Sequence, residues 1–198
     1  MKSMIFSRSL AVGRNYFLAL GSLLLLSLSA CSVDTGENSG VSKKPEKPTE
    51  MSQEKYEKYL KIIEDSRKNI AEKEDFSRQD YLNLAFHSDI LGDFETAKEN
   101  YKKILEKNSN DFVANNNLAN IYEKEGKAEE ALEIFIRLSE NNPGMLEPFR
   151  DAANLFKKLG KKKEGKKFVN DFSGRYTGKK DSYFTNMIRD RLQAFDSE

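Results

Sequence analysis

Few residues of this chain are of the types that carry out chemistry. It has one cysteine, Cys31, and one histidine, His87. No other nucleophile or metal-ligand type gathers around His87 in the sequence, and a single histidine on a helix is usually a surface or packing residue. The sequence contains no glycine-rich phosphate loop, no Ser-His-Asp arrangement and no cluster of cysteine or histidine. We therefore expect no enzyme, no metal site and no cofactor.

The start of the chain indicates where Cys31 acts. Three basic residues, Lys2, Arg8 and Arg14, precede the apolar run "YFLALGSLLLLSLSAC", which is short for a membrane-spanning helix and is typical of a secretory signal. The segment Leu28, Ser29, Ala30 and Cys31 resembles the lipobox of bacterial lipoproteins. The resemblance implies that residues 1–30 are a cleaved signal peptide and that Cys31 carries the lipid. The alternatives are an ordinary signal peptide with an incidental cysteine, or an uncleaved anchor.

Residues 31–50 are expected to form the acylated cysteine and a disordered tether. The stretch "SVDTGENSGVSKKPEKPTE" has proline, glycine, serine and charge but almost nothing to bury. Flexible-chain scaling gives such a tether a typical reach of roughly 25 Å. One acyl chain binds a membrane only marginally and two or more hold a protein there. Ser32 after the lipobox, rather than an aspartate, favours the outer membrane, facing the periplasm, if the cell has one.

The rest of the chain repeats with a period of 34 residues. Gly92, Gly126 and Gly160 coincide under this shift, and so do Ala85, Ala119 and Ala153. Each glycine follows an apolar-periodic segment and precedes another, as expected where a left-handed residue ends a helix. Small residues let two antiparallel helices approach and large ones fill the space beside them. The pattern predicts an all-α protein built from repeated helix pairs.

This pattern resembles the tetratricopeptide repeat signature. The copy at 112–145 is nearly complete, the copy at 78–111 is good, and the copy at 146–179 is degenerate because Gly165 and Val169 replace the usual alanine and aromatic residue. The resemblance implies a helical-repeat solenoid of about three helix pairs. In the best copy the signature positions are Leu118, Ala119, Tyr122, Gly126, Ala131, Phe135, Leu138 and Pro143.

Stacked repeats need terminal elements that cover their exposed apolar faces. Residues 51–77 are expected to supply an N-terminal flanking helix, with Tyr56, Leu60, Ile63 and Ile70 on one stripe. Residues 180–198 are expected to form a C-terminal capping helix. Two alternatives for this last helix are that it detaches to bind a partner, or that it folds back into the groove of the array. Its apolar stripe consists of Phe184, Met187, Ile188, Leu192 and Phe195.

The family resemblance also implies a binding groove lined by the first helix of each repeat, where such arrays commonly bind extended peptides. Amide side chains suit a peptide backbone and an arginine suits a carboxylate. The pair Arg150 and Asn154 is similar to the carboxylate-holding clamp of chaperone-binding members, although the rest of that clamp is not evident. Solvated helix faces are the alternative interpretation. The predicted groove residues are Leu82, Phe86 and Ile90, then Asn116, Asn120 and Lys124, and finally Arg150, Asn154 and Lys158.

Charge is unevenly distributed along the chain. Residues 150–198 contain 13 basic and 7 acidic side chains, and many of the basic ones lie between Lys157 and Lys167. This segment could face anionic lipid, acidic cell-wall polymer or an acidic partner, or it could be a solvated lysine-rich turn. The expected exported location argues against nucleic acid as a partner.

Together these features predict a membrane-anchored, non-catalytic protein-interaction scaffold or adaptor in the bacterial cell envelope. Its expected partner is an envelope protein or peptide that the sequence does not identify. The alternative is a ligand-binding accessory subunit of a solute transport system, for which Leu82, Phe86 and Ile90 would supply apolar lining.

Overall fold

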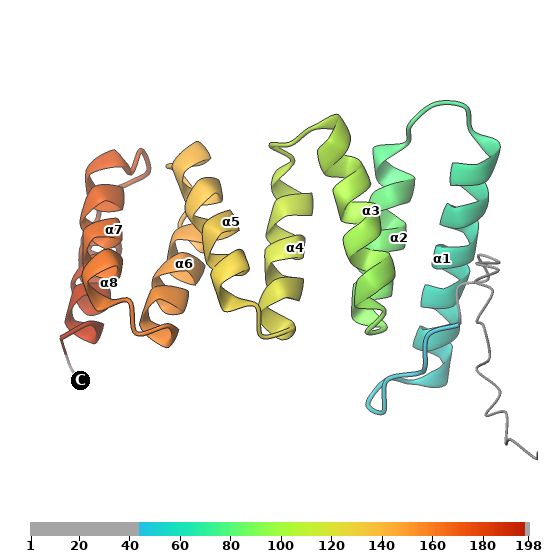
Figure 1. The fold of residues 1–198 in the computed structure, drawn as a ribbon, viewed down its shortest axis with the longest axis horizontal. Helices are drawn as coiled ribbons and strands as arrows, with labels where there is room; N and C mark the ends of the chain where they lie inside the picture. Colours follow the sequence, from blue (N-terminus) through green and yellow to red (C-terminus); the bar gives the residue numbers. More distant parts are fainter. Residues whose placement is uncertain (1–43, 197–198) are drawn as a thin grey trace, which may run out of the picture. The chain divides into compact units, whose positions relative to one another are not determined.

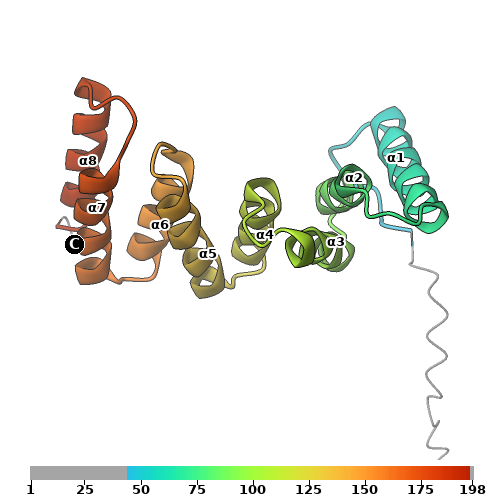
Figure 2. The same cartoon turned by 90° about the horizontal axis from the view of Figure 1, so that it is seen from above.

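The computed structural model describes residues 44–196, so the predicted signal peptide, Cys31 and most of the predicted tether lie outside the described residues. The described part is all α-helical, and each helix packs against the next along the chain (Figures 1 and 2). The prediction of a helical-repeat fold is confirmed. The helices are α1 Gln53–Glu72, α2 Arg78–Ile90, α3 Phe94–Lys107, α4 Phe112–Lys124, α5 Ala128–Asn141, α6 Glu147–Lys158, α7 Lys162–Arg175 and α8 Ser182–Ala194.

The three repeated glycines lie at the turns between paired helices. Gly92, Gly126 and Gly160 have φ angles of 78°, 79° and 66°, in the left-handed region that residues with a Cβ atom rarely adopt. They join α2 to α3, α4 to α5 and α6 to α7. Each turn therefore closes one helical hairpin, as the 34-residue spacing predicts.

The second repeat, α4 and α5, shows how small and large residues share the core. Ala119 on α4 and Ala131 on α5 are fully buried, which lets the two helix backbones approach. Phe135 is also fully buried and Leu118 is 5% exposed, so the large side chains fill the space beside the alanines. Close packing of this kind supplies most of the stability of short helices in water.

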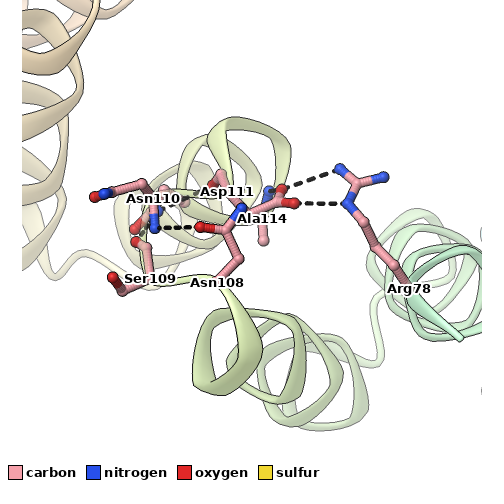
Figure 3. Close-up of polar contacts among 7 residues, drawn as sticks. Arg78, Asn108, Ser109, Asn110, Asp111 and Ala114 are labelled. Carbon is pink, nitrogen blue, oxygen red and sulfur yellow. Dashed lines mark hydrogen bonds and ion pairs between the residues drawn. The ribbon is translucent and has the colours of Figure 1, made fainter. Parts of the chain in front are cut away.

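The joint between the first two repeats is polar (Figure 3). Asp111 caps α4, because one carboxylate oxygen accepts a 3.0 Å hydrogen bond from the Ala114 N–H. The same carboxylate accepts two hydrogen bonds from the Arg78 guanidinium at the start of α2, at 2.6 and 3.0 Å. Arg78 lowers the pKa of Asp111, and Asp111 raises the pKa of Arg78. One side chain thus starts α4 and ties it to the preceding repeat.

Helix α1 covers the N-terminal end of the first repeat. Tyr56 and Ile63 of α1 form a small buried cluster with Leu84 and Leu91. At the end of α1, Lys73 Nζ lies 2.5 Å from the Asp80 carboxylate of α2. Lys73, assisted by hydrogen bonds from Ser77 and Asn69, lowers the pKa of Asp80 to about 2.

Helix α8 packs at the other end of the described array, against α7. Its Phe195 lies beside Gly165 so closely that a Cβ atom on Gly165 would be 2.5 Å from the Phe195 Cζ atom. The Tyr176 and Phe184 rings stack at 4.3 Å between centroids. The departure from alanine at position 165, which makes the third repeat look degenerate, therefore admits a side chain of α8.

Phe184 and Met187 of α8, and Phe195 at its C-cap, are buried with the core of the repeats. In the structure α8 thus occupies the capping position, and its polar residues remain on the surface. None of the helices between residues 44 and 196 combines the length and apolar character needed to cross a lipid bilayer.

Candidate protein-interaction surface

The apolar part of the predicted groove, on α2, is only partly open. Leu82 is half-buried and packs against the core, and Ile90 is also half-buried. Phe86 is 44% exposed and lies edge-on to the His87 ring, with 5.4 Å between centroids. The His87 ring also contacts Tyr59 of α1, at 5.0 Å between centroids. His87 is thus a packing residue between α1 and α2, and the exposed apolar surface here is mainly one ring.

The middle of the surface is an open hollow of about 440 Å³ that spans α2, α4 and α6. It brings together the predicted residues Asn120, Lys124 and Lys158, together with two acidic residues, Asp89 and Glu123. Of the nine predicted groove residues, these three come from two different repeats and meet in one place. The hollow has the size of a small ligand site but is open to solvent, as a surface for an extended chain would be.

The two lysines of this hollow are ion-paired with the first helix of the preceding repeat. Lys124 Nζ lies 2.7 Å from Asp89 Oδ1, and Lys158 Nζ lies 3.1 Å from Glu123 Oε1. Both lysine side chains are about half exposed, at 48% and 57%. The pairs join first helices of successive repeats at the same offset of 35 residues. The positive charges of the predicted groove residues Lys124 and Lys158 are therefore each paired with an acidic side chain of the protein.

Asn116 lies differently from Asn120, although the two are one turn apart on α4. Its side-chain oxygen is buried and has no hydrogen-bond partner within the described residues, whereas Asn120 lines the hollow. Of these two predicted groove residues, Asn120 lines the hollow and Asn116 does not. The neighbouring Asn115 stabilises the start of α4, because its side-chain amide donates hydrogen bonds to the backbone oxygens of Ser109 and Asp111.

A second open hollow, of about 420 Å³, lies between α6 and α8. Arg150 and Asn154 of α6 form one side of it, as the sequence predicted for the third repeat. Across residues 44–196, neither side chain has a hydrogen bond or an ion pair. The other side comes from α8 and consists of Tyr183, Asn186, Met187, Asp190 and Arg191.

Except for Met187, which belongs to the predicted apolar stripe, these α8 residues were not among the predicted groove residues, although one alternative for the last helix was that it folds into the groove. The signal that could have found them is the opposite face of the same helix, where Tyr183, Asn186 and Asp190 recur at helical spacing. Asp89 and Glu123 were missed as well. They are 34 residues apart, and each stands directly before a predicted groove residue, Ile90 or Lys124.

A half-buried carboxylate, Asp151, lies beside the α6–α8 hollow. Burial raises its pKa, and the nearby carboxylates of Glu147 and Glu123 act in the same direction. Arg150 and Arg191 each oppose that rise. The guanidinium groups of Arg150 on α6 and Arg191 on α8 therefore both lie close enough to Asp151 to lower its pKa.

Several lysines of the basic segment Lys157–Lys167 are paired with carboxylates of the protein itself. Lys161 lies 3.7 Å from Glu129, Lys167 lies 2.6 Å from Asp171, and Lys166 pairs with Asp196. Lys158 is paired with Glu123 as well, so four lysines of this segment have an acidic partner in the protein. An anionic surface as the ligand of this segment stays a prediction.

No three histidine, cysteine, aspartate or glutamate side chains gather as a metal site anywhere from residue 44 to residue 196.

A comparison with protein-family models matches residues 91–148 to the family described as tetratricopeptide repeat. The match covers the α3, α4 and α5 helices and reaches the start of α6. No curated protein matches the chain.

Proposed function

We propose that this chain binds an extended segment of a protein partner, because residues 91–148 match the tetratricopeptide repeat family, whose repeats are generally non-catalytic interaction scaffolds. The proposed surface runs over the first helices α2, α4 and α6 and onto α8. The observation that carries this proposal is that predicted groove residues from the second and third repeats line two open hollows, one over α2, α4 and α6 and one between α6 and α8.

The chemistry of this surface suits a peptide in extended conformation. Asn120 and Asn154 each offer an amide donor and acceptor, which a peptide backbone can pair with. Phe86 offers an exposed ring at one end, and Arg150 offers free donors at the other. A partner segment would then contact apolar, amide and charged side chains in turn.

Site-specific photo-crosslinking in the native cells tests this surface. A photoreactive residue at Asn120 or Asn154 is expected to capture the same partner protein, while the same residue at Glu133 or Asn170 is not. Glu133 and Asn170 are exposed on the second helices α5 and α7, outside both hollows. Equal capture from all four positions, or none from Asn120 and Asn154, would exclude this surface as the binding site.

We also propose that the chain is a lipoprotein of the bacterial envelope, anchored by acyl chains on Cys31 and facing the periplasm from the outer membrane where one exists. The support is the basic and apolar start of the chain with its lipobox-like end. Metabolic labelling with a clickable palmitate analogue is expected to mark the wild-type protein and not Cys31→Ser. Equal labelling of the two, or cleavage at a different site, would contradict the anchor.

The alternative function, an accessory subunit of solute transport, requires a closed apolar cavity for its ligand. The hollows on α2, α4, α6 and α8 are instead open and lined mainly by polar side chains. No feature of the described residues favours this alternative over the protein scaffold.

A further inference from the structure

The α6–α8 hollow brings together two arginine side chains that have no partner within the described residues. Arg150 and Arg191 line it from two helices, and neither has an ion pair or hydrogen bond within residues 44–196. Two arginines elsewhere are held by carboxylates of the protein: Arg78 binds Asp111, and Arg175 lies 3.6 Å from Glu140. Two free guanidinium groups around one hollow form a site that can accept an anionic group from outside.

The charge around the hollow narrows the class of ligand. Asp190 also lines it, and Asp151 lies close enough for both arginines to influence its pKa. Glu147 and Glu123 add further negative charge nearby. The local field is therefore not strongly positive, so a highly charged polyanion would be repelled by the carboxylates. A single carboxylate that reaches the two guanidinium groups directly gains short, charge-assisted hydrogen bonds.

The lining also indicates how such a carboxylate is presented. Asn154 and Asn186 stand on opposite sides of the hollow and can pair with a peptide backbone, while Met187 and Tyr183 offer apolar surface. Because the hollow is open and continues the surface of α4 and α6, it suits a chain that passes through it. This favours an acidic side chain of an extended segment over a chain end.

We propose that Arg150 and Arg191 together bind an aspartate or glutamate side chain of the partner segment, with α8 supplying half of the site. This inference rests on the proposed interaction surface and specifies which group of the partner the C-terminal end recognises. It also gives α8 a part in binding, in addition to covering the end of the repeats.

Blocked peptides test this site by NMR with the full-length chain in detergent micelles. The probes are acetyl-Ala-Leu-Glu-Ala-amide, the same peptide with glutamine, and the glutamine peptide with a free C-terminal carboxylate. The glutamate peptide is expected to shift the side-chain Nε–Hε signals of Arg150 and Arg191 saturably. The other two peptides are expected to bind at least tenfold more weakly.

Three variants separate direct contact from general charge. Arg150→Gln and Arg191→Gln are each expected to weaken binding of the glutamate peptide at least tenfold, because each removes charge-assisted hydrogen bonds. Asp190→Asn is expected to strengthen it about two- to fivefold, since a repelling carboxylate is removed. Arg189→Gln is the matched control: it makes the same charge change on α8 at an exposed residue outside the hollow, and affinity should not change.

Several outcomes would overturn the proposal. One is equal binding of the glutamate and glutamine peptides, and another is tighter binding of the free C-terminal carboxylate. A third is an equal loss of affinity in Arg189→Gln and Arg191→Gln, which would show only a general charge effect. Unchanged backbone amide spectra confirm that each variant is folded. If crosslinking at Asn120 succeeds while these tests fail, only the carboxylate site is wrong and the interaction surface stands.

Discussion

The second and third repeats hold equivalent places in the array but differ where each meets its neighbours. The second repeat begins with a capping aspartate, Asp111, that is tied to Arg78. The third has Met145 at the equivalent position, and its first helix has no side-chain cap. In α5 the small residue is Ala131, whereas in α7 it is Gly165, which admits Phe195. The third repeat thus departs from the repeat signature where it contacts a neighbour that the second repeat does not have.

The two repeats also use their surface charges differently. Lys124 of the second repeat is paired with Asp89 of the first, and Lys158 of the third with Glu123 of the second. Arg150 of the third repeat has no such partner in residues 44–196 and lines a hollow with α8. Lys124 and Lys158 therefore join successive repeats, while Arg150 and Arg191 at the C-terminal end remain available to a ligand.

The largest expected effect is at the start of the second repeat. Asp111→Ala should lower the free energy of unfolding by about 2 to 3 kcal/mol, because a helix cap and two charge-assisted hydrogen bonds are lost. The matched control is Asp93→Ala, which removes only the cap of α3 and should cost about 1 kcal/mol. Urea denaturation measures both. Equal losses in the two variants would show that the Arg78 contact adds nothing.

The effect of Asp111 should depend on pH. Arg78 lowers the pKa of Asp111 in the folded protein, so the folded state binds this proton less tightly than the unfolded state. The stability that the carboxylate contributes is therefore complete above the ordinary aspartate pKa and is lost as the pH falls through the lowered value. The difference between wild type and Asp111→Ala should shrink in acid.

A smaller but sharper effect is expected at Gly165. Gly165→Ala restores the usual alanine of the repeat, but its Cβ atom would meet Phe195 at 2.5 Å and Phe156 Cβ at 3.0 Å. Overpacking of this kind costs about 2 kcal/mol, and here it should loosen α8. Trypsin cleavage between α7 and α8 and urea denaturation measure the two effects.

Gly174 provides the matched control in the same helix. A Cβ atom there would meet nothing within 4 Å, so Gly174→Ala should stabilise the protein by about 0.5 to 1 kcal/mol through helix propensity. Adding Phe195→Ala to Gly165→Ala should remove the overpacking penalty. If Gly165→Ala stabilised the protein as much as Gly174→Ala does, the contact with Phe195 would not explain the glycine.

The repeat period made most of the fold predictable. The glycines at 34-residue spacing mark turns, and Ala119, Ala131 and Phe135 mark the packed faces, because these contacts are made within one helix pair and recur along the chain. The reason for Gly165 was not predictable. Gly165 contacts Phe195, which follows α8 and lies outside the repeated region. The repeat pattern therefore gives no information about which side chain packs there.

The candidate site was predictable to a similar extent. Helical spacing placed Asn120, Arg150 and Asn154 on the surface correctly, because position within a repeat determines which face a residue occupies. It did not reveal the contribution of α8, whose orientation depends on packing against α7. It also did not reveal that Lys124 is paired, since that contact joins two repeats at an offset of 35 and not 34.

A smaller effect is expected from Asp151→Asn. This substitution gives the third repeat the amide that the second repeat has at the equivalent position, Asn117. Burial raises the pKa of Asp151, so the folded state binds the proton more tightly than the unfolded state. Any stability linked to this proton is then present at low pH and lost as the pH rises through the raised pKa. Asp151→Asn should therefore stabilise the protein at pH 7, by less than about 1 kcal/mol, and should have almost no effect below about pH 4. A stabilisation that is the same at both pH values would contradict this origin.

The smallest expected effect tests whether charges within the array are paired and those at its end are free. A double-mutant cycle with Asp89→Asn and Lys124→Gln should give a coupling energy of about 0.5 kcal/mol, because Lys124 is half exposed and water and salt screen the pair. The cycle with Asp190→Asn and Arg150→Gln, whose charges line one hollow without an ion pair between them, should give a value near zero. Urea denaturation at low and at 0.5 M salt measures both, and the first coupling should fall with salt. A coupling between Asp190 and Arg150 as large as that between Asp89 and Lys124 would mean that Arg150 is held by its own protein. The guanidinium group would then have to break that contact before it could bind a carboxylate of a partner.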